Sequence, residues 1–282
     1  MHTVELTLYV DGLLQDLLIA ELADLDFDAF EQDTALLKAY APAARWTDSK
    51  RAYIEQWLAE RGVTDPIEER LLEPQNWNKL WEASIQPIAV GPFLIAPTWA
   101  DVPPEYRHHI VLTIDPKMSF GTGFHESTRL VLRFLEVLVM PGDRVLDAGA
   151  GTAILAIAAV KLGAASAVAF DIDEWAQQNA VENIEQNGVA EQVDFRAGSI
   201  EVVPEEAFDL ILANINRSVL LDLLPAFVAR LAPGGHIVLA GVLLEDRDDL
   251  LAAARPHGLA AVREASENEW WSVVLARPGE EG

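Results

Sequence analysis

A glycine-rich turn joins an apolar strand to an apolar helix in the middle of the chain, and it restricts the fold more than any other segment. The strand and turn read VLDAGAG over residues 145–151, and the helix TAILAIAAV follows directly at residues 152–160. Gly149 and Gly151 let the backbone turn tightly and approach a ligand, and the N-terminus of the helix offers unpaired N–H groups. Glycines at such a junction also serve as an ordinary turn, but the position is one where α/β proteins bind nucleotides.

Strands and helices alternate around this turn. The elements expected after residue 127 are helices at 128–139, 153–162, 174–187, 219–231 and 245–254, and strands at 144–147, 167–171, 193–197, 208–213 and 236–240. Strands that alternate with helices of about 10 to 15 residues predict a parallel sheet covered on both faces. Two final strands, at 260–264 and 269–276, have only a short turn between them and therefore predict an antiparallel hairpin at the sheet edge.

Residues 1–72 follow a different plan. A strand at residues 4–10 alternates Val4, Leu6, Leu8 and Val10 on one face, and Asp11 can cap a helix that follows. The leucines at 13, 14, 17, 18, 22 and 25 form the apolar stripe of that helix. Strands at 27–30 and 36–40, a helix opened by Thr47 or Asp48 and stopped by Gly62, and a strand at 67–72 complete the order βαββαβ. This order predicts a small ferredoxin-like α+β domain.

We expect the domain boundary after residue 72. A short helix capped by Asn76 and carrying Trp77 and Trp81 should link the two parts. Residues 73–127 then form this linker helix and a region before the core of the second domain, which spans 73–282. Two apolar segments with prolines, 87–97 and 109–115, are expected to be strands or loops that pack on the edge of the structure that follows them.

Composition excludes several classes of protein. The 282 residues carry 20 Lys and Arg against 45 Asp and Glu, a net charge of −25, which excludes a general binder of nucleic acid. Cysteine is absent, so disulfide frameworks, cysteine-ligated zinc, iron–sulfur clusters and a cysteine nucleophile are excluded, and no metal site is expected. The first Lys or Arg is Lys38, and no apolar run approaches the roughly 18 residues of a membrane span. We therefore expect a cytoplasmic protein without a membrane partner.

Asp171 and the residues around it indicate which nucleotide is bound. Asp171 lies 22 residues beyond Gly149 at the end of the next strand, where a carboxylate can accept both ribose hydroxyl protons. The competing interpretation is a helix cap, a role that Asp173 can fill alone. A dinucleotide site would prefer a third glycine near Ala153 and a second mononucleotide-binding half, and neither is evident.

Three features favour S-adenosylmethionine instead. They are Asp147 before the first glycine, the terminal hairpin, and the polar Asn214 at the tip of the fourth strand of the alternation. Together they predict a seven-stranded class I methyltransferase sheet, that is, an α/β, Rossmann-like fold. The sulfonium and the amine of S-adenosylmethionine are cationic, so acidic residues near the strand tips attract this cofactor.

Several motifs together resemble the ribosomal protein L11 methyltransferase family over nearly the whole chain. They are WNKLWEASIQPIAVGPFLIAPTW at 77–99, DPKMSFGTGFHESTR at 115–129, LDAGAGTAILAIAA at 146–159, FDIDEWA at 170–176 and DLILANI at 209–215. The resemblance implies methylation of amino groups, on lysines or at the N-terminus of one large-subunit ribosomal protein. It also implies that the N-terminal domain holds the substrate and that a flexible connection lets the catalytic domain reach several amines.

Carried over by motif, the resemblance implies cofactor contacts from five residues. These residues are Thr128, Gly149, Gly151, Asp171 and Asn214. The family usually has G-C-G-S-G where this chain has Gly149-Ala150-Gly151-Thr152-Ala153. Ala153 therefore replaces the third glycine, which allows close packing of the helix. It often has two threonines where this chain has Ser127 and Thr128, a change that keeps the Thr128 contact.

Methyl transfer to an amine needs alignment and a neutral nitrogen rather than a strong acid or a metal. We hypothesise that Asn214 orients the attacking nitrogen and contacts the cofactor, the alternative being that it only terminates its strand. His125 is a conceivable proton acceptor, but a lone loop histidine is more often structural, and no catalytic residue is assigned. The loop at 119–123, with Phe120 and Phe124 beside it, is expected to close over the cofactor.

Other functions share parts of this pattern. An RNA methyltransferase is disfavoured because neither domain has a basic stripe, and a glutamine-modifying enzyme would carry Asn-Pro-Pro-aromatic where this chain has Asn-Ile-Asn-Arg at 214–217. A methyltransferase of another protein or of a small molecule, a non-catalytic module with a nucleotide fold, and an NAD-dependent oxidoreductase stay open. We expect a monomer.

The acidity has two interpretations. Residues 1–72 carry 15 acidic and 6 basic residues, a surface that can attract a basic ribosomal protein through an interaction that salt weakens. The remaining charge of −16 lies on the second domain, and acidity throughout the chain equally suits a salt-adapted organism.

Overall fold

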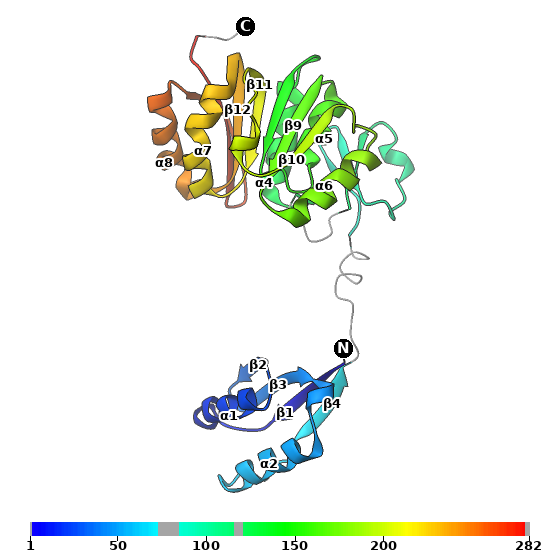
Figure 1. Cartoon of the computed structure of the whole chain (residues 1–282), viewed down its shortest axis with the longest axis vertical. Coiled ribbons are helices and arrows are strands. Elements are labelled where there is room, and N and C mark those ends of the chain that lie inside the picture. Colours follow the sequence, from blue (N-terminus) through cyan, green and yellow to red (C-terminus); the bar gives the residue numbers. More distant parts are fainter. Residues whose placement is uncertain (1, 73–84, 116–120, 280–282) are drawn as a thin grey trace. The chain divides into compact units, whose positions relative to one another are not determined.

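The computed structural model describes residues 2–72, 85–115 and 121–279. The chain divides into two compact units, Met1–Trp81 and Glu82–Gly282 (Figure 1). The predicted helix with Asn76, Trp77 and Trp81 lies outside the described residues, and the boundary after residue 72 stays a prediction. No helix in the described ranges is long and apolar enough to cross a bilayer.

The first unit has the predicted order βαββαβ. Its elements are β1 (Thr3–Leu8), α1 (Gly12–Asp24), β2 (Ala29–Asp33), β3 (Leu36–Pro42), α2 (Asp48–Ala59) and β4 (Glu68–Leu72). The strands form one antiparallel sheet in the order β2-β3-β1-β4. Asp11 is the predicted cap of α1 and accepts a hydrogen bond from the Leu14 N–H at 3.2 Å. Of the two candidates for the start of α2, Thr47 is the cap and accepts a hydrogen bond from the Lys50 N–H at 3.4 Å.

One face of this small sheet is buried under both helices. Val4, Leu6 and Leu8 of β1 share a core with Leu37, Ala39 and Ala41 of β3, with Leu18 and Leu22 of α1, and with Ile54 and Trp57 of α2. The apolar stripe of α1 is narrower than predicted, since the side chain of Leu17 is 58% exposed. The alternation in β1 predicts its buried face correctly. The leucines of α1 predict a wider buried face than the helix has.

The second unit contains the predicted seven-stranded sheet. Its strands are β8 (Arg144–Ala148), β9 (Ser166–Asp171), β10 (Val193–Ala197), β11 (Phe208–Asn214), β12 (Leu231–Leu243), β13 (Ala260–Glu267) and β14 (Trp270–Ala276), in the order β10-β9-β8-β11-β12-β14-β13. The first five in this order are parallel, and β14 and β13 form the predicted antiparallel hairpin. β12 is longer than predicted because its ladders reach from Leu231, opposite Phe208, to Leu243, opposite Trp270.

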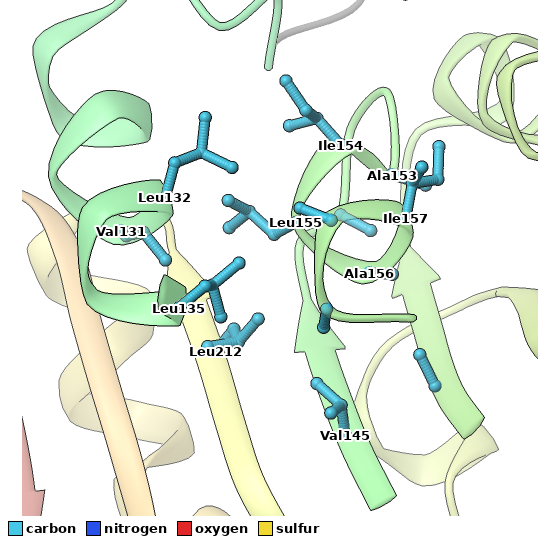
Figure 2. Close-up of a cluster of buried hydrophobic side chains, with 14 of the residues drawn as sticks. Val131, Leu132, Leu135, Val145, Ala153, Ile154, Leu155, Ala156, Ile157 and Leu212 are labelled. Carbon is cyan, nitrogen blue, oxygen red and sulfur yellow. The ribbon is translucent and has the colours of Figure 1, made fainter. Parts of the chain in front are cut away.

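Helices cover both faces of the large sheet, as the alternation predicts. They are α4 (Glu126–Leu138), α5 (Ile154–Leu162) and α6 (Glu174–Gln186) on one face, and α7 (Arg217–Arg230) and α8 (Arg247–Ala254) on the other. Neighbouring residues of β8 serve opposite faces, because Val145 packs with α4 and α5 while Leu146 packs with α7. Figure 2 shows the first of these cores, in which Leu135 of α4 and Leu155 of α5 meet above Leu212 of β11.

The segments before α4 are strands, one of the two alternatives that the sequence left open, and they pack within the second unit without joining its large sheet. They form a separate three-stranded sheet from β5 (Ile88–Val90), β6 (Phe93–Ala96) and β7 (Ile110–Thr113). Their buried side chains share the core of α4 and α5. Asn187, at the end of α6, holds β7 by exchanging two hydrogen bonds with the Thr113 backbone, at 3.0 and 2.7 Å. Continuous apolar sequence could not distinguish packing on helices from pairing at an edge.

We predict that Leu212→Ala lowers the free energy of unfolding by about 2 to 5 kcal/mol, because the side chain is fully buried in the central strand and its loss leaves a cavity. Chemical denaturation of the full chain measures this change. Leu244→Ala is the matched control, since that side chain is 49% exposed, and it should change the free energy by less than about 0.5 kcal/mol. Equal effects of the two substitutions would contradict the assigned core.

Candidate functional site

A cavity of about 600 Å³ lies at the carboxyl ends of β8, β9, β10, β11 and β12. It is lined by His125, Ser127, Gly149, Gly151, Phe170, Asp171, Ile172, Ser199, Asn214, Ile215, Asn216, Val219, Leu223, Gly241 and Trp270. Four of the five predicted contact residues are in this lining. The carboxyl end of a parallel sheet is where α/β proteins bind their ligands, because the strand-to-helix loops there converge on one crevice.

In the glycine turn after β8, Gly149 leaves space for the Ile215 side chain that any other residue would fill. Gly149 has φ +69°, and a Cβ atom at this position would overlap the Ile215 side chain. The Gly149 and Ala150 N–H groups donate to the Phe170 carbonyl at 2.9 and 3.0 Å, which ties the turn to the end of β9. At the third glycine position of the family, Ala153 is buried with φ +62°, a left-handed conformation that alanine adopts at a cost of about 1 to 2 kcal/mol.

Asp171 lines the cavity and is not the cap of the following helix. Its Oδ2 accepts a hydrogen bond from the Gly151 N–H at 2.8 Å, and its Oδ1 accepts one from the Asp173 N–H at 3.0 Å. Asp173 caps α6 by accepting from the Trp175 N–H at 2.9 Å. The carboxylate of Asp171 is thus fixed beside the glycine turn, and its contact with a ribose stays a prediction.

Asn214 ends β11 and presents an unpaired oxygen. The side chain is only 8% exposed, and its Nδ2 donates to the Thr128 hydroxyl at 3.2 Å. Its Oδ1 is buried and has no hydrogen-bond partner among the described residues. A buried amide oxygen without a partner is costly, so it indicates a donor that arrives with a ligand.

Thr128 lies behind Asn214 rather than in the lining of the cavity. It is fully buried in the first turn of α4, and the neighbouring Ser127 is the residue of this helix that faces the cavity. In the structure Thr128 therefore orients the Asn214 amide. Its direct contact with a cofactor stays a prediction.

Asp147 is a fully buried carboxyl beneath the glycine turn. Its Oδ2 accepts a hydrogen bond from the Ala156 N–H at 3.0 Å, in the first turn of α5, while Oδ1 has no partner among the described residues. Burial raises the pKa of Asp147 to about 7, and the charge of Asp171 adds to this rise, which the Ala156 N–H partly offsets. Asp147 supplies the cap that α5 otherwise lacks, since Ala153 makes no side-chain cap bond.

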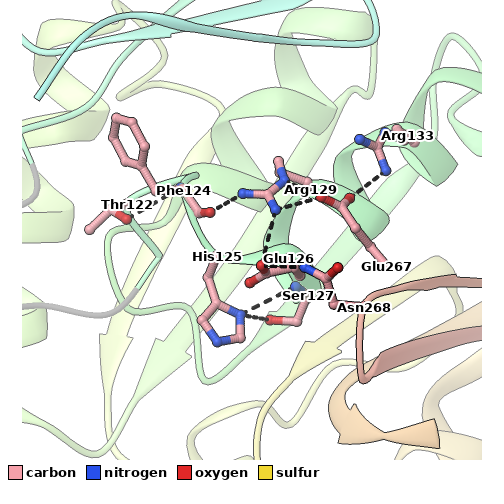
Figure 3. Close-up of polar contacts among 9 residues, drawn as sticks. All are labelled: Thr122, Phe124, His125, Glu126, Ser127, Arg129, Arg133, Glu267 and Asn268. Atoms are coloured by element: carbon pink, nitrogen blue, oxygen red, sulfur yellow. Dashed lines mark hydrogen bonds and ion pairs between the residues drawn. The ribbon is translucent and has the colours of Figure 1, made fainter.

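His125 and Trp270 form an aromatic corner of the cavity. His125 is the N-cap of α4, where its Nδ1 accepts from the Ser127 N–H at 3.2 Å and lies 2.8 Å from the Ser127 Oγ (Figure 3). Its ring meets the Trp270 indole edge-on, with ring centroids 4.4 Å apart. His125 therefore has a structural role at this position, as the cap of α4.

Several lining residues were not predicted. Ile172 and Ser199 follow β9 and β10, Ile215 follows β11, Gly241 lies within β12, and Trp270 begins β14. Ile172, Ser199, Ile215 and Gly241 share one signal, a position at the carboxyl end of a parallel strand, which is readable once the strand ends are known. Trp270 begins an antiparallel strand and lacks this signal. Ile215 also lies between two glycines, because a Cβ on Gly241 would approach the Ile215 carbonyl oxygen to 2.6 Å.

The loop expected to close over the cofactor is described only in part. Ser119 and Phe120 lie outside the described residues. Gly121 is held at the glycine turn, because its carbonyl accepts a hydrogen bond from the Thr152 hydroxyl at 2.6 Å. Closure of the loop stays a prediction.

Comparison with known proteins places this geometry in one family. The family model of the ribosomal protein L11 methyltransferases (PrmA) matches residues 18–278. A ribosomal protein L11 methyltransferase of Chlorobaculum parvum is 39% identical over 280 residues, covering 96% of each chain. One of Porphyromonas gingivalis is 39% identical over 264 residues, covering 90% of this chain and 88% of that protein. The crystal structure of a ribosomal protein L11 methylase from Lactobacillus delbrueckii subsp. bulgaricus superimposes with a TM-score of 0.64 at 29% identity, covering 68% of this chain and 99% of that one.

We predict that Gly149→Ala weakens the binding of S-adenosylmethionine by tenfold or more, because the added methyl group would displace Ile215 from the cavity wall. Isothermal titration calorimetry measures the affinity. Gly188→Ala is a matched control, since Gly188 has φ +68° with open space around its Cβ position and carries the backbone strain without the collision. The control should lose about 1 kcal/mol of stability and keep its affinity. Similar affinity losses in both variants would contradict the role of Ile215.

A second prediction concerns Asp147 and pH. Its pKa in the folded protein, about 7, lies above its unfolded value, so the folded state binds more protons between these values and loses stability as pH rises toward 7. Asp147→Asn abolishes this titration. Thermal melts from pH 5 to 8 should therefore show the variant gaining about 2 to 3 kcal/mol on the unsubstituted chain across this range. Any fixed cost of the substitution is the same at every pH, so a difference that does not change with pH would contradict the prediction.

Proposed function

This chain belongs to the ribosomal protein L11 methyltransferase family, and from that membership we propose that it methylates amino groups of ribosomal protein L11, on lysine side chains, at the N-terminus, or at both. S-adenosylmethionine is the methyl donor of this family. The observation that carries the proposal is the unpaired Asn214 Oδ1, which lies at the end of the central strand in a cavity that the glycine turn also lines. Such a protein would work in the cytoplasm, where ribosomes are built.

The residues of the cavity suit this methyl donor. Asp171 would accept hydrogen bonds from the ribose hydroxyls, and its negative charge favours a cationic ligand. Gly149 and Gly151 allow the backbone to approach the ligand, and Ile172 and Phe170 offer apolar surface to an adenine ring. When bound, S-adenosylmethionine supplies an electrophilic methyl group for an in-line displacement. The sulfonium sulfur that carries this methyl group is the leaving group and becomes a neutral thioether.

Asn214 is the residue we propose to orient the acceptor. Its Nδ2 is held by the Thr128 hydroxyl, so Oδ1 has one fixed direction and can accept a hydrogen bond from the attacking amine. An amide oxygen accepts from a neutral amine without competing for its lone pair, which leaves that pair directed at the methyl group. Alignment of this kind is the main contribution an enzyme can make to a displacement with a neutral leaving group.

The attacking nitrogen has to be neutral. A lysine ammonium has a pKa near 10.4 and an α-amine one near 8, so the α-amine loses its proton more easily at neutral pH. The apolar part of the lining, Ile215, Val219 and Leu223, disfavours a charged ammonium by desolvation. His125 Nδ1 is engaged by Ser127, and we assign no general base.

We also propose that residues 1–72 recognise the protein substrate and that residues 73–282 form the methyltransferase domain. What supports this is charge: the segment 1–72 has a net charge of −9, and ribosomal proteins are generally basic. Electrostatic attraction of this kind speeds association and weakens as salt is added.

We predict that the full chain transfers the labelled methyl group of S-adenosylmethionine to purified L11, and that Asn214→Ala lowers kcat by about a hundredfold and weakens cofactor binding. The alanine variant loses the acceptor that aligns the nitrogen. Scintillation counting measures the rate, and mass spectrometry of L11 peptides distinguishes lysine side chains from the N-terminus.

The matched control for this assay is Asn187→Ala. It removes a half-buried asparagine that binds the Thr113 backbone and does not line the cavity, so kcat should stay within about threefold of the unsubstituted value. Full activity of Asn214→Ala would overturn the role of Asn214. Transfer to another protein or to a small molecule, with none to L11, would overturn the proposed substrate.

A further inference from the structure

An ion-pair cluster outside the cavity joins α4 to the terminal hairpin. Glu267, the last residue of β13, accepts hydrogen bonds from Arg129 Nε at 2.9 Å and Nη2 at 2.5 Å, and from Arg133 Nη1 at 2.7 Å (Figure 3). Asn268 donates to Glu126 Oε1 at 3.0 Å, and Arg129 Nη2 lies 3.4 Å from the same oxygen. Residues separated by more than 130 positions in the sequence are thereby linked.

The cluster is stronger than an ordinary surface ion pair. The side chains of Arg129 and Glu267 are only 19% and 26% exposed, and one carboxylate is shared by two guanidinium groups. The Arg129 and Arg133 side chains hold the pKa of Glu267 below its ordinary value, so the carboxylate is ionised at neutral pH. Partial burial and several charge-assisted bonds both favour a fixed geometry over a fluctuating pair.

This cluster fixes three segments around the aromatic corner of the cavity. Arg129 also donates to the Phe124 carbonyl, next to His125. Asn268 forms the hairpin turn with φ +53°, and Trp270 begins the next strand two residues later. His125 precedes Glu126 of the cluster in the chain, and Trp270 pairs with Glu267 across the hairpin. The rings of His125 and Trp270 are in contact, while none of the cluster residues lines the cavity.

Trp270 lies on the side of the cavity away from Asp171. In the sheet order three strands, β8, β11 and β12, separate β9, which ends at Asp171, from β14, which begins at Trp270. If the ribose is held at β9 and the reacting methyl group is near Asn214 on β11, the wall formed by Trp270 faces the acceptor. This step rests on the proposed function.

We propose that Glu267 is a positioning residue for methyl transfer, which holds Trp270 against His125 and so shapes the side of the cavity that receives the amine. Glu267 acts through Arg129 and Arg133 on α4 and through the hairpin turn. Without it the turn can move away from α4, and the aromatic wall loses its fixed distance from Asn214. The amine then enters in more orientations, of which fewer are aligned for attack.

The test compares two glutamates of the same strand. Glu267→Gln removes the charge and keeps the shape of the side chain. Glu264→Gln is the matched control, because Glu264 also pairs with two nitrogens of one arginine, Arg247 of α8, at 2.6 and 2.9 Å, and among the described residues it has no hydrogen bond or ion pair with α4. We expect Glu267→Gln to lower kcat for L11 about tenfold or more while the Kd of S-adenosylmethionine stays within twofold. Glu264→Gln should keep both values.

A double-mutant cycle shows whether Glu267 acts through Trp270. Trp270→Phe combined with Glu267→Gln should cost less than the product of the two single effects, because both remove the same wall. Acrylamide quenching gives a readout that does not depend on activity. The fluorescence contributed by Trp270, obtained by subtracting the Trp270→Phe spectrum, should become more accessible in the Glu267→Gln background and not in the Glu264→Gln background.

Equal kcat in the two glutamate variants, multiplicative effects in the cycle, or unchanged quenching would each overturn the inference. If Glu267→Gln fails to fold, Arg133→Gln removes only one bond of the cluster from a half-exposed position and should show the same loss at smaller size. Absence of transfer by the unsubstituted chain would overturn the proposed function, and this inference with it, before any variant is compared.

Discussion

The cavity depends on the close packing of Ile215 between two glycines. Gly149 after β8 leaves space for the Ile215 side chain, and Gly241 in β12 leaves space for its backbone. A side chain at either glycine would push the segment after β11 out of place. Because Ile215 is held in this way, Asn214 before it and Asn216 after it both line the cavity. The absence of side chains at Gly149 and Gly241, on the two strands that flank β11, thus determines where the polar groups at the end of β11 lie.

The polar side chains around the cavity also lie at or near the carboxyl ends of these strands. Asp171 accepts hydrogen bonds from two backbone N–H groups, and the Thr128 hydroxyl accepts one from the Asn214 amide nitrogen, so the orientation of both side chains is determined by residues outside the cavity or at its wall. Asp147 has one oxygen that caps α5 and one that has no partner among the described residues. Buried acceptors without donors lower stability, and their presence at a strand-end cavity is typical of a site that a ligand completes.

The aromatic corner shows how distant segments complete the site. Trp270 comes from a hairpin at the far end of the chain, and it meets His125 because Glu267 is bound by α4. Nothing in the local sequence around Trp270 predicts this meeting, since its strand has a regular apolar pattern. The same limit applies to the pre-core segments, whose apolar runs left strands and loops open and did not show that α4 and α5 would cover them.

By itself the sequence determined the order and type of the main elements in residues 3–72 and 126–276, the parallel sheet with its terminal hairpin, and the cavity residues Gly149, Gly151, Asp171 and Asn214. These follow from local patterns, namely apolar periodicity, glycine at a strand-to-helix turn, and polar residues at strand ends. Tertiary structure alone decided that Thr128 lies behind Asn214, that Asp147 is buried with a raised pKa, and that Trp270 closes the corner. Those properties depend on burial and on contacts between residues far apart in the chain. The local sequence around such a residue does not indicate which distant residue it contacts.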